Sequence, residues 1–389
     1  MSGWIWALIL LAALVPTAWL FRFAGRLTRR PYFRDMEFLT AFGWMLGLAA
    51  LLFGLQLYFF NEQAQFFRWA VQGLAIFAVA AWLFRLLGRN VGTQATRRLF
   101  RHMPLTASFG ILMILIYAIV AIFAPLLAPY GQAEIFPAVN VLPGGDPALG
   151  GDPTHPLGTD QIGRDLLSRL IYGAQNTVGI AFVTTCLAFL LGGTLGFLAA
   201  TIGGWLDQLL SRGVDVLMAI PSLIFALLLM TIASAWAGSR SELLTLYMIL
   251  IIAVIDSTRV YRLARAVGSS IVVMDYIEAA KLRGEGLGYL IFREVLPNAT
   301  APLLAEFGLR FCFVFLTIAA LSFLGVGIQP PLADWGTMVR DLSQFINFAA
   351  FSPLTAALPL MAAGAIALLT VAVNFVVDWM LHRSSGLGD

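Results

Sequence analysis

Two long apolar runs of this sequence are separated by the polar stretch 275–297, DYIEAAKLRGEGLGYLIFREVLP. Asp275 and Glu278 have the spacing of a capping box, in which the first side chain caps a helix and the second returns the bond. Residues 279–283 are good helix formers. The start of this stretch therefore predicts a short helix that lies outside the apolar runs.

Three glycines follow this predicted helix, at Gly284, Gly286 and Gly288. Glycine tolerates backbone conformations that end or swivel a helix. A second short helix is expected over about 287–294, and Pro297 is expected to end it and start the next apolar run. The stretch predicts a compact knob whose small alanines allow another surface to approach closely. A merely amphipathic pair of helices at the membrane interface is the alternative.

The composition places the rest of the chain in a membrane. Of its 389 residues, 60% are hydrophobic and 12% are charged, whereas soluble domains carry about 25% charge. Runs of about 20 apolar residues can cross the hydrocarbon core as helices, because lipid offers no partner for backbone polar groups. Nine such runs occur: 3–24, 38–60, 66–88, 105–128, 173–202, 207–236, 243–267, 298–325 and 354–382.

The distribution of arginine predicts the orientation. Arginines crowd the connections 22–34 and 85–101 and the segment 259–293, which alternate to the same side. The connection 129–172 on the opposite side has only Arg164 and Arg169. Basic loops stay in the cytoplasm, so nine spans put the N-terminus outside and the C-terminus inside. The first run lacks a basic leader and is interpreted as a retained span of an inner (plasma) membrane protein.

The long exterior connection ends in 155–173, HPLGTDQIGRDLLSRLIYG. Thr159 or Asp160 is expected to cap a short helix there. A second exterior stretch, 321–336, reads LSFLGVGIQPPLADWG, whose glycines and prolines stop the preceding span. Its tryptophan alone is also typical of a membrane interface.

The stretch 275–297 resembles the EAA motif of ABC importer permeases: Glu-Ala-Ala, three residues, Gly, nine residues, then Ile-x-Leu-Pro. The sequence matches this spacing and departs at the isoleucine, which is Glu294. The resemblance implies a coupling helix that docks into a cleft of an ATPase subunit. The implied coupling residues are Asp275, Glu278, Ala279, Ala280, Lys281, Arg283, Gly284, Gly288, Leu296 and Pro297.

Both exterior stretches resemble signatures of the dipeptide, oligopeptide and nickel permeases. This resemblance covers about 105–389 and implies an all-α membrane protein with the six-helix core of a type I ABC importer. Residues 1–104, with about three extra transmembrane helices, fall outside it. The implied scaffold on the side of the binding protein comprises His155, Gly158, Asp160, Arg164, Asp165 and Trp335.

Ionisable residues inside spans are costly and mark function by default. They are Arg212, Asp215, Asp256, Arg259, Glu306, Arg310 and Asp378. Glu306 and Arg310 are four residues apart and can pair on one helix face. Pro221 is expected to kink its span, near a gate or for packing alone. These charges are interpreted either as structural pairs or as a translocation pathway, whose candidates are Met218, Pro221, Asp256, Glu306 and Arg310.

Enzyme chemistry is not expected of this chain. A phosphate-binding G-x-x-x-x-G-K-[ST] sequence is absent, and the only lysine is Lys281. The cysteines Cys186 and Cys312 lie in apolar runs and are interpreted as small buried hydrophobes, and no metal site or nucleic-acid surface is expected.

The resemblance implies a complex with a homologous second permease, two ATPases that bind ATP and Mg²⁺, and an extracytoplasmic substrate-binding protein. The expected function is ATP-driven import of peptides. A nickel, opine or other small-solute importer is the alternative within the class. A secondary transporter is the alternative outside it, but that class predicts inverted repeats that are not visible.

Overall fold

The computed structural model describes residues 15–21, 37–60, 65–238, 240–348 and 352–384. Within these ranges the regular secondary structure is helical, apart from three isolated β-bridges in the connection between α6 and α7. It divides into two compact units, Met1–Ala75 and Ile76–Asp389, which are described separately below. The domain boundary expected at 104/105 stays a prediction.

In the first unit, residues 15–21 are helical and α3 runs over Phe38–Phe60, which agrees with the run expected at 38–60. The run expected at 3–24 lies mostly outside the described residues. Helix α4, Gln65–Asn90, begins in this unit and ends in the second. Its bounds agree with the run expected at 66–88.

The second unit contains most of the long apolar helices. They are α6 (Leu105–Leu127), α8 (Gly179–Ile202), α11 (Ser241–Val272), α14 (Leu296–Phe323) and α16 (Pro353–Ser384). In the described part of the chain, six helical stretches are long and apolar enough to cross a membrane, or up to seven if one bent pair counts as a span. The total of nine spans stays a prediction.

A short basic helix, α5 (Gln94–His102), precedes α6 and was not expected as a separate element. Thr93 caps it, because the Thr93 hydroxyl accepts a hydrogen bond from the Thr96 amide at 3.3 Å. Arginines at 97, 98 and 101 make it strongly amphipathic. The arginine-rich connection that predicts the cytoplasmic side is thus partly an ordered helix.

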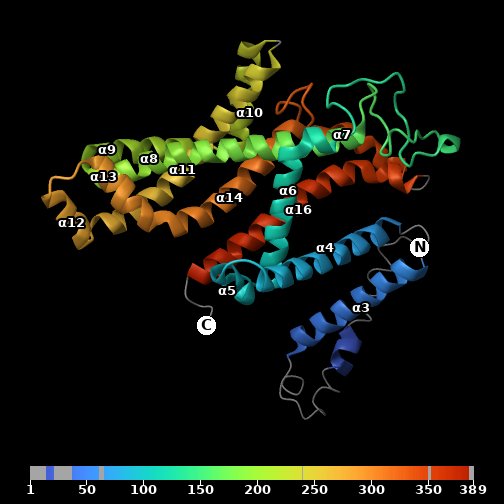
Figure 1. The fold of residues 1–389 in the computed structure, drawn as a ribbon, viewed down its shortest axis with the longest axis horizontal. Helices are drawn as coiled ribbons and strands as arrows, with labels where there is room; N and C mark the ends of the chain where they lie inside the picture. The colour runs from blue at the N-terminus through green and yellow to red at the C-terminus, as the bar shows by residue number, and fades with distance from the viewer. Residues whose placement is uncertain (1–14, 22–36, 61–64, 239, 349–351, 385–389) are drawn as a thin grey trace. The chain divides into compact units, whose positions relative to one another are not determined.

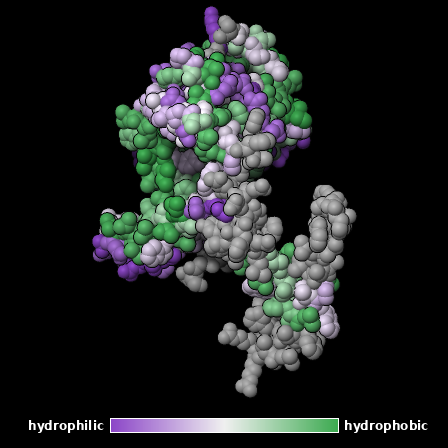
Figure 2. Space-filling model, turned by 90° about the vertical axis from the view of Figure 1, so that its right-hand side faces the viewer, coloured by the Kyte–Doolittle hydropathy of each residue, from purple (hydrophilic) through white to green (hydrophobic). Residues whose placement is uncertain are grey.

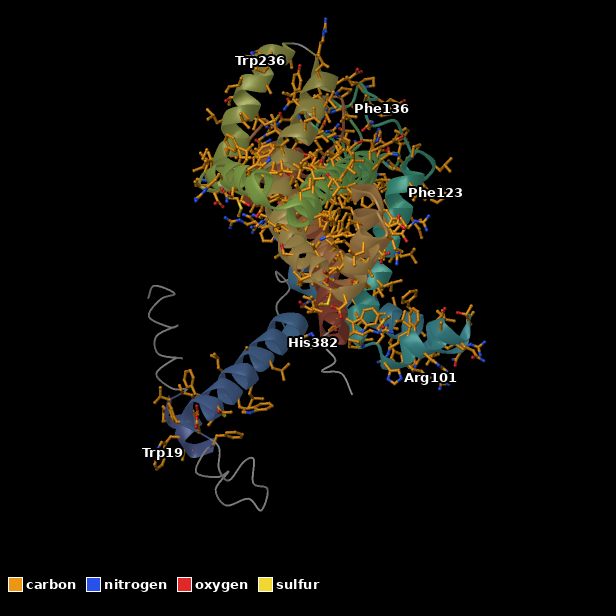
Figure 3. All side chains as sticks on the ribbon, turned by 90° about the vertical axis from the view of Figure 1, so that its left-hand side faces the viewer. Trp19, Arg101, Phe123, Phe136, Trp236 and His382 are labelled. Atoms are coloured by element: carbon orange, nitrogen blue, oxygen red, sulfur yellow. The ribbon has the colours of Figure 1, made fainter. Side chains whose placement is uncertain are left out.

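The run expected at 207–236 is two helices, α9 (Gly204–Met218) and α10 (Ser222–Ala237), which meet at 87°. That this pair forms one span of the membrane stays a prediction. The kink expected at Pro221 is present as a full break, because Pro221 has extended backbone torsions and precedes the first residue of α10. Helix α10 projects from the rest of its unit (Figure 1). Its Trp236 lies at the outside (Figure 3) and is 77% exposed.

Helices α8 and α11 run side by side (Figure 1) and make the most extensive helix–helix contact of the unit. Their contact uses small residues, which let two backbones approach. A Cβ atom added at Gly196 would lie 2.7 Å from the Tyr261 carbonyl oxygen, and one at Gly192 would strike the Ser257 carbonyl. The glycines of α8 therefore fix how near α11 can lie.

A row of polar contacts holds α9 against α11. Asp207 pairs with Arg265, and Asp215 accepts a 2.6 Å hydrogen bond from Arg262. The hydroxyls of Ser211 and Tyr261 lie 3.0 Å apart between these pairs. We name these three contacts the α9–α11 ladder.

The largest buried cluster lies among α6, α8, α10, α11, α14, α16 and the short helix α15 (Trp335–Leu342). Phe315 is fully buried at its centre. Many large apolar side chains nevertheless lie on the outside (Figure 2). This distribution suits a chain whose outer helix faces contact lipid.

Candidate coupling, exterior and translocation sites

The first helix of the knob, α12, runs over Asp275–Leu282. Met274 is its N-cap and makes no side-chain cap bond; its carbonyl accepts hydrogen bonds from the amides of Ile277 and Glu278 at 2.9 and 3.3 Å. The expected capping box is therefore wrong, because the helix starts one residue earlier. Asp275 and Glu278 instead lie in the first turn, where negative charge interacts favourably with the helix dipole.

Gly284 ends α12 as expected. The amide of Gly284 bonds to the Lys281 carbonyl at 2.9 Å, and that of Glu285 to the Ala280 carbonyl at 3.2 Å. This pair of bonds is a Schellman motif, which needs a left-handed residue just after the helix. Gly284 supplies it with φ +82°.

The second half of the knob differs from the expectation. Helix α13 (Leu287–Tyr289), the π-helix η3 (Leu290–Val295) and α14 follow without a break, so Leu287–Phe323 is one helical stretch. Gly288 lies inside it and does not swivel the chain. Pro297 lies at the start of α14, as expected, but it does not end the preceding helix, because the helical stretch continues through it.

The knob has a buried face and an exposed face. Ile277 and Ala280 are fully buried in a cluster with Leu290, Ile291 and Val295. Ala280 therefore supports the knob from inside. Leu296 is half-buried at the start of α14. The exposed face comprises Asp275, Glu278, Ala279, Lys281, Leu282, Arg283, Gly284, Gly288 and Pro297.

At the other end of the α8–α11 pair lies the connection 128–165 with α7, Leu166–Gly173 (Figure 1). Asp165 lies in the interior of this connection and is 1% exposed. It caps α7 by accepting hydrogen bonds from the Ser168 amide at 2.7 Å and the Ser168 hydroxyl at 2.6 Å. Its other oxygen lies 2.9 Å from Nδ1 of His155, which is packed against Tyr130 and Phe136.

The expectation that Thr159 or Asp160 caps this helix is wrong. Thr159 instead bridges two parts of the connection, because its hydroxyl donates to the Ala138 carbonyl at 2.9 Å. Asp160 closes a turn onto Arg164, accepting from its amide at 2.9 Å and its Nε at 2.7 Å. Gly158 precedes them with φ +79°. Buried Asp160, Arg164 and Asp165 thus form the interior of the connection.

The two exterior stretches meet through α15. Trp335 is 2% exposed, and its Nε1 donates to the Leu170 carbonyl at 2.9 Å. Trp335 is therefore a core residue, and the alternative of a tryptophan at the membrane interface is wrong. Asp334 caps α15 and accepts a 3.0 Å hydrogen bond from Thr177. Burial raises the pKa of Asp334.

Further polar residues of this junction were missed from the sequence. Gln132 accepts hydrogen bonds from the Asn176 side chain at 2.8 Å and the Ala333 amide at 3.0 Å. No local spacing links positions more than 40 residues apart. The one sequence signal for Gln132 and Asn176 is that each is an isolated amide residue beside an apolar run.

In the membrane-spanning helices, the structure brings Asp256, Glu306 and Arg310 together. Nε of Arg310 lies 2.7 Å from Oε1 of Glu306, which confirms the expected i,i+4 ion pair. Nη1 of Arg310 lies 3.6 Å from Oδ1 of Asp256 on α11. Neither Nε nor Nη1 of Arg310 makes a hydrogen bond of regular geometry to any of the described residues. The cluster is thus held by charge more than by aligned hydrogen bonds.

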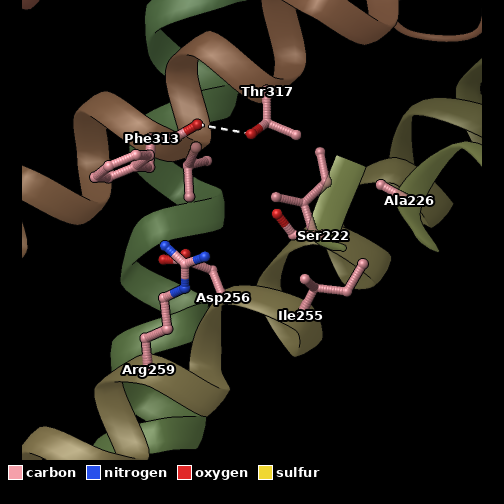
Figure 4. A pocket seen from close by; sticks show the side chains of 9 residues that line it. Ser222, Ala226, Ile255, Asp256, Arg259, Phe313 and Thr317 are labelled. Atoms are coloured by element: carbon pink, nitrogen blue, oxygen red, sulfur yellow. Dashed lines mark hydrogen bonds between the residues drawn. The ribbon is translucent and has the colours of Figure 1, made fainter. Parts of the chain in front are cut away.

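A cavity of about 120 Å³ lies beside this cluster (Figure 4). Asp256 and Arg259 line it from α11, Phe313 and Thr317 from α14, and Ser222 from the first turn of α10. Pro221 directly precedes Ser222, whereas Met218 does not line the cavity. The break at Pro221 therefore places the start of α10 against the two charged helices.

The comparisons with known proteins agree with this arrangement. Residues 192–385 match the family described as "binding-protein-dependent transport system inner membrane component", and residues 92–143 match the "N-terminal TM domain of oligopeptide transport permease C". The chain is 35% identical over 245 residues to the dipeptide transport system permease protein DppC of Haemophilus influenzae. That match covers 62% of this chain and 79% of the relative.

The chain belongs to this family of inner-membrane transport components. DppC of Escherichia coli strain K12 is 36% identical over 245 residues, covering 62% of this chain and 78% of the relative. A putative peptide transport system permease protein of Brucella abortus is 34% identical over 263 residues, covering 66% and 82%. The family has the type I ABC importer fold, and the chain is a multi-pass inner-membrane permease.

Other single residues of the permease lie as follows. Cys312 is buried as expected, but Cys186 is exposed on α8, so its assignment as a buried residue is wrong. Asp215 pairs with Arg262 in the α9–α11 ladder. Asp378 is exposed near the end of α16, and its carbonyl oxygen lies 2.8 Å from the His382 ring.

Proposed function

We propose that this chain is one of two permease subunits of an ATP-driven importer, which moves peptides from an extracytoplasmic binding protein into the cytoplasm. The observation that carries the proposal is the match to dipeptide permeases, which covers nearly four fifths of their length. Nickel or another small solute remains the alternative substrate.

The ATP-hydrolysing subunits are separate chains in this proposal, and they bind the ATP and Mg²⁺. The exposed face of the knob is their contact surface. It combines charge at Glu278 and Lys281 with apolar Leu282, which is 84% exposed. Such a surface pairs apolar contact with charges that select a partner. The Schellman turn at Gly284 fixes how these side chains are presented.

The exterior connection and α15 support docking of the binding protein. Their signature residues are mostly buried, so they act in the proposal as a rigid frame, and the exposed loop residues around them make contact. The second, homologous permease completes the translocation pathway. With nine spans the N-terminus lies outside and the knob lies in the cytoplasm. Residues 1–104 add about three helices to this core.

Uptake by the reconstituted complex tests the substrate. Proteoliposomes that contain both permeases and both ATPases, supplied with the binding protein and ATP, are expected to accumulate labelled dialanine. Accumulation of Ni²⁺ without dialanine would overturn the peptide assignment.

The coupling surface is tested by the charge reversal Glu278→Arg. We expect it to abolish copurification of the ATPases and ATP hydrolysis stimulated by the binding protein. The matched control is Glu242→Arg, which reverses an exposed charge in the first turn of α11. Intact association and stimulation in the Glu278 variant would refute the assignment.

A further inference from the structure

Asp256 is an unusual residue for its position. It lies near the middle of α11, the helix over Ser241–Val272, and is only 8% exposed. One carboxylate oxygen, Oδ2, has no hydrogen-bond partner among the described residues. A buried carboxylate without a full set of partners is strongly unfavourable. Such a group inside a membrane span marks a functional site.

The charged groups around Asp256 leave its hydrogen bonding incomplete. Arg310 is shared between two carboxylates, lying 2.7 Å from Glu306 and 3.6 Å from Asp256. The trio alone has a net charge of −1, and Arg259 of α11, whose guanidinium carbon lies 5.7 Å from the centroid of the Phe313 ring, balances it. Arg310 also stacks on the Phe313 ring, with its guanidinium carbon 4.5 Å from the centroid. This stacking and the ion pair with Glu306 engage Arg310, and Oδ2 of Asp256 has no hydrogen bond from it.

A cavity adjoins the Asp256 side chain. Asp256 lines the cavity, and Ser222 of α10 lies across it (Figure 4). The volume of about 120 Å³ holds an ammonium group with its neighbouring carbons but is far below that of pockets enclosing a whole ligand. The cavity therefore fits one end of a substrate, and the remainder extends outside it.

We propose that Asp256 binds the N-terminal ammonium of a peptide during its passage through the membrane. The inference rests on the proposed function and adds a chemical rule for substrate selection. A primary ammonium group donates three hydrogen bonds, which suits a carboxylate that lines the cavity and whose hydrogen bonding is incomplete. Exposed Arg259 lines the same cavity and favours the carboxylate end of a short peptide. The site thus complements a zwitterion.

Direct binding tests this assignment. The purified complex in nanodiscs, without the binding protein, is titrated to millimolar concentrations with dialanine and with N-acetyl-dialanine. The wild-type complex is expected to bind dialanine about tenfold more tightly, which is the effect of one hydrogen bond between charged groups. Asp256→Asn is expected to remove this preference, whereas Asp256→Glu keeps it. Glu242→Gln, the matched control on α11, is expected to leave it unchanged.

Comparing two peptides on one preparation makes the result independent of how much of a variant folds. The proposal is overturned if the wild-type complex binds both peptides equally or binds neither. It is also overturned if the preference survives in Asp256→Asn. If the wild-type complex imports dialanine without preferring the free amine in this assay, the function stands and the role of Asp256 is wrong.

Discussion

The buried carboxylate of Asp165 predicts how the exterior connection is stabilised. In Asp165→Ala, the Ser168 amide and hydroxyl and the His155 ring lose their acceptor. Loss of a helix N-cap costs about 1 kcal/mol. Breaking a buried charged contact costs roughly 3–5 kcal/mol, and the two effects overlap because they share one side chain. We expect a total loss of about 3–4 kcal/mol in the local stability of the connection.

Amide hydrogen exchange of residues 158–168 measures this loss. When opening and closing are fast, the exchange rate follows the open population, so 3 kcal/mol corresponds to a roughly hundredfold faster rate. The matched control is Asp146→Ala in the same connection. Asp146 is exposed and caps a 3-10 turn through a 2.9 Å bond to the Ala148 amide. We expect less than about a tenfold change there. Equal rates in the two variants would refute the argument.

Three more predictions concern the helices. Gly284→Ala is expected to destabilise the knob by about 1 kcal/mol, because residue 284 has a positive φ, and to weaken copurification of the ATPases. Gly286→Ala is the control, because φ is −76° there, and it should change neither the stability nor the copurification appreciably. Gly196→Ala is expected to lower the melting temperature of the purified permease, because the added methyl group would push α8 away from α11. Gly193→Ala is the control, because a methyl group there has no neighbouring atom within 4 Å. Equal melting temperatures of the two variants would contradict this packing. Trp335→Phe removes the hydrogen bond to a carbonyl of α7 and is expected to cost about 1 kcal/mol, measured by chemical unfolding relative to wild type.

Much of the fold was predictable because apolar length decides where a helix can cross a membrane. The bounds of α3, α4, α6 and α16 agree with the predicted runs within a few residues. The break between α9 and α10 was underestimated, since Pro221 alone does not distinguish a kink from an 87° turn. That difference depends on tertiary contacts such as the α9–α11 ladder.

The candidate sites were predictable to a different extent. The termination at Gly284 follows from backbone conformation, which is local and visible in sequence. The cap of α7 was placed five residues early, at Asp160 in place of Asp165, because both acidic residues precede the helix start. Helix α12 has Met274 as its N-cap and no side-chain cap bond. The contact between Arg310 and Asp256 joins separate helices. Spacing within one helix revealed only its partner Glu306.

The unbroken helix from Leu287 to Phe323 has a mechanical consequence. Glu306 lies 19 residues from its start (306 − 287), or about 28 Å at 1.5 Å per residue. A tilt of about 10° at the knob therefore displaces the ion cluster by about 5 Å, if the helix moves as a rod of that length. Helix α11 also runs continuously from Asp256 toward the knob. Arg310 of α14 contacts Asp256 of α11 at the level of the ion cluster. A small tilt of α14 at the knob is therefore converted into a larger displacement at this contact.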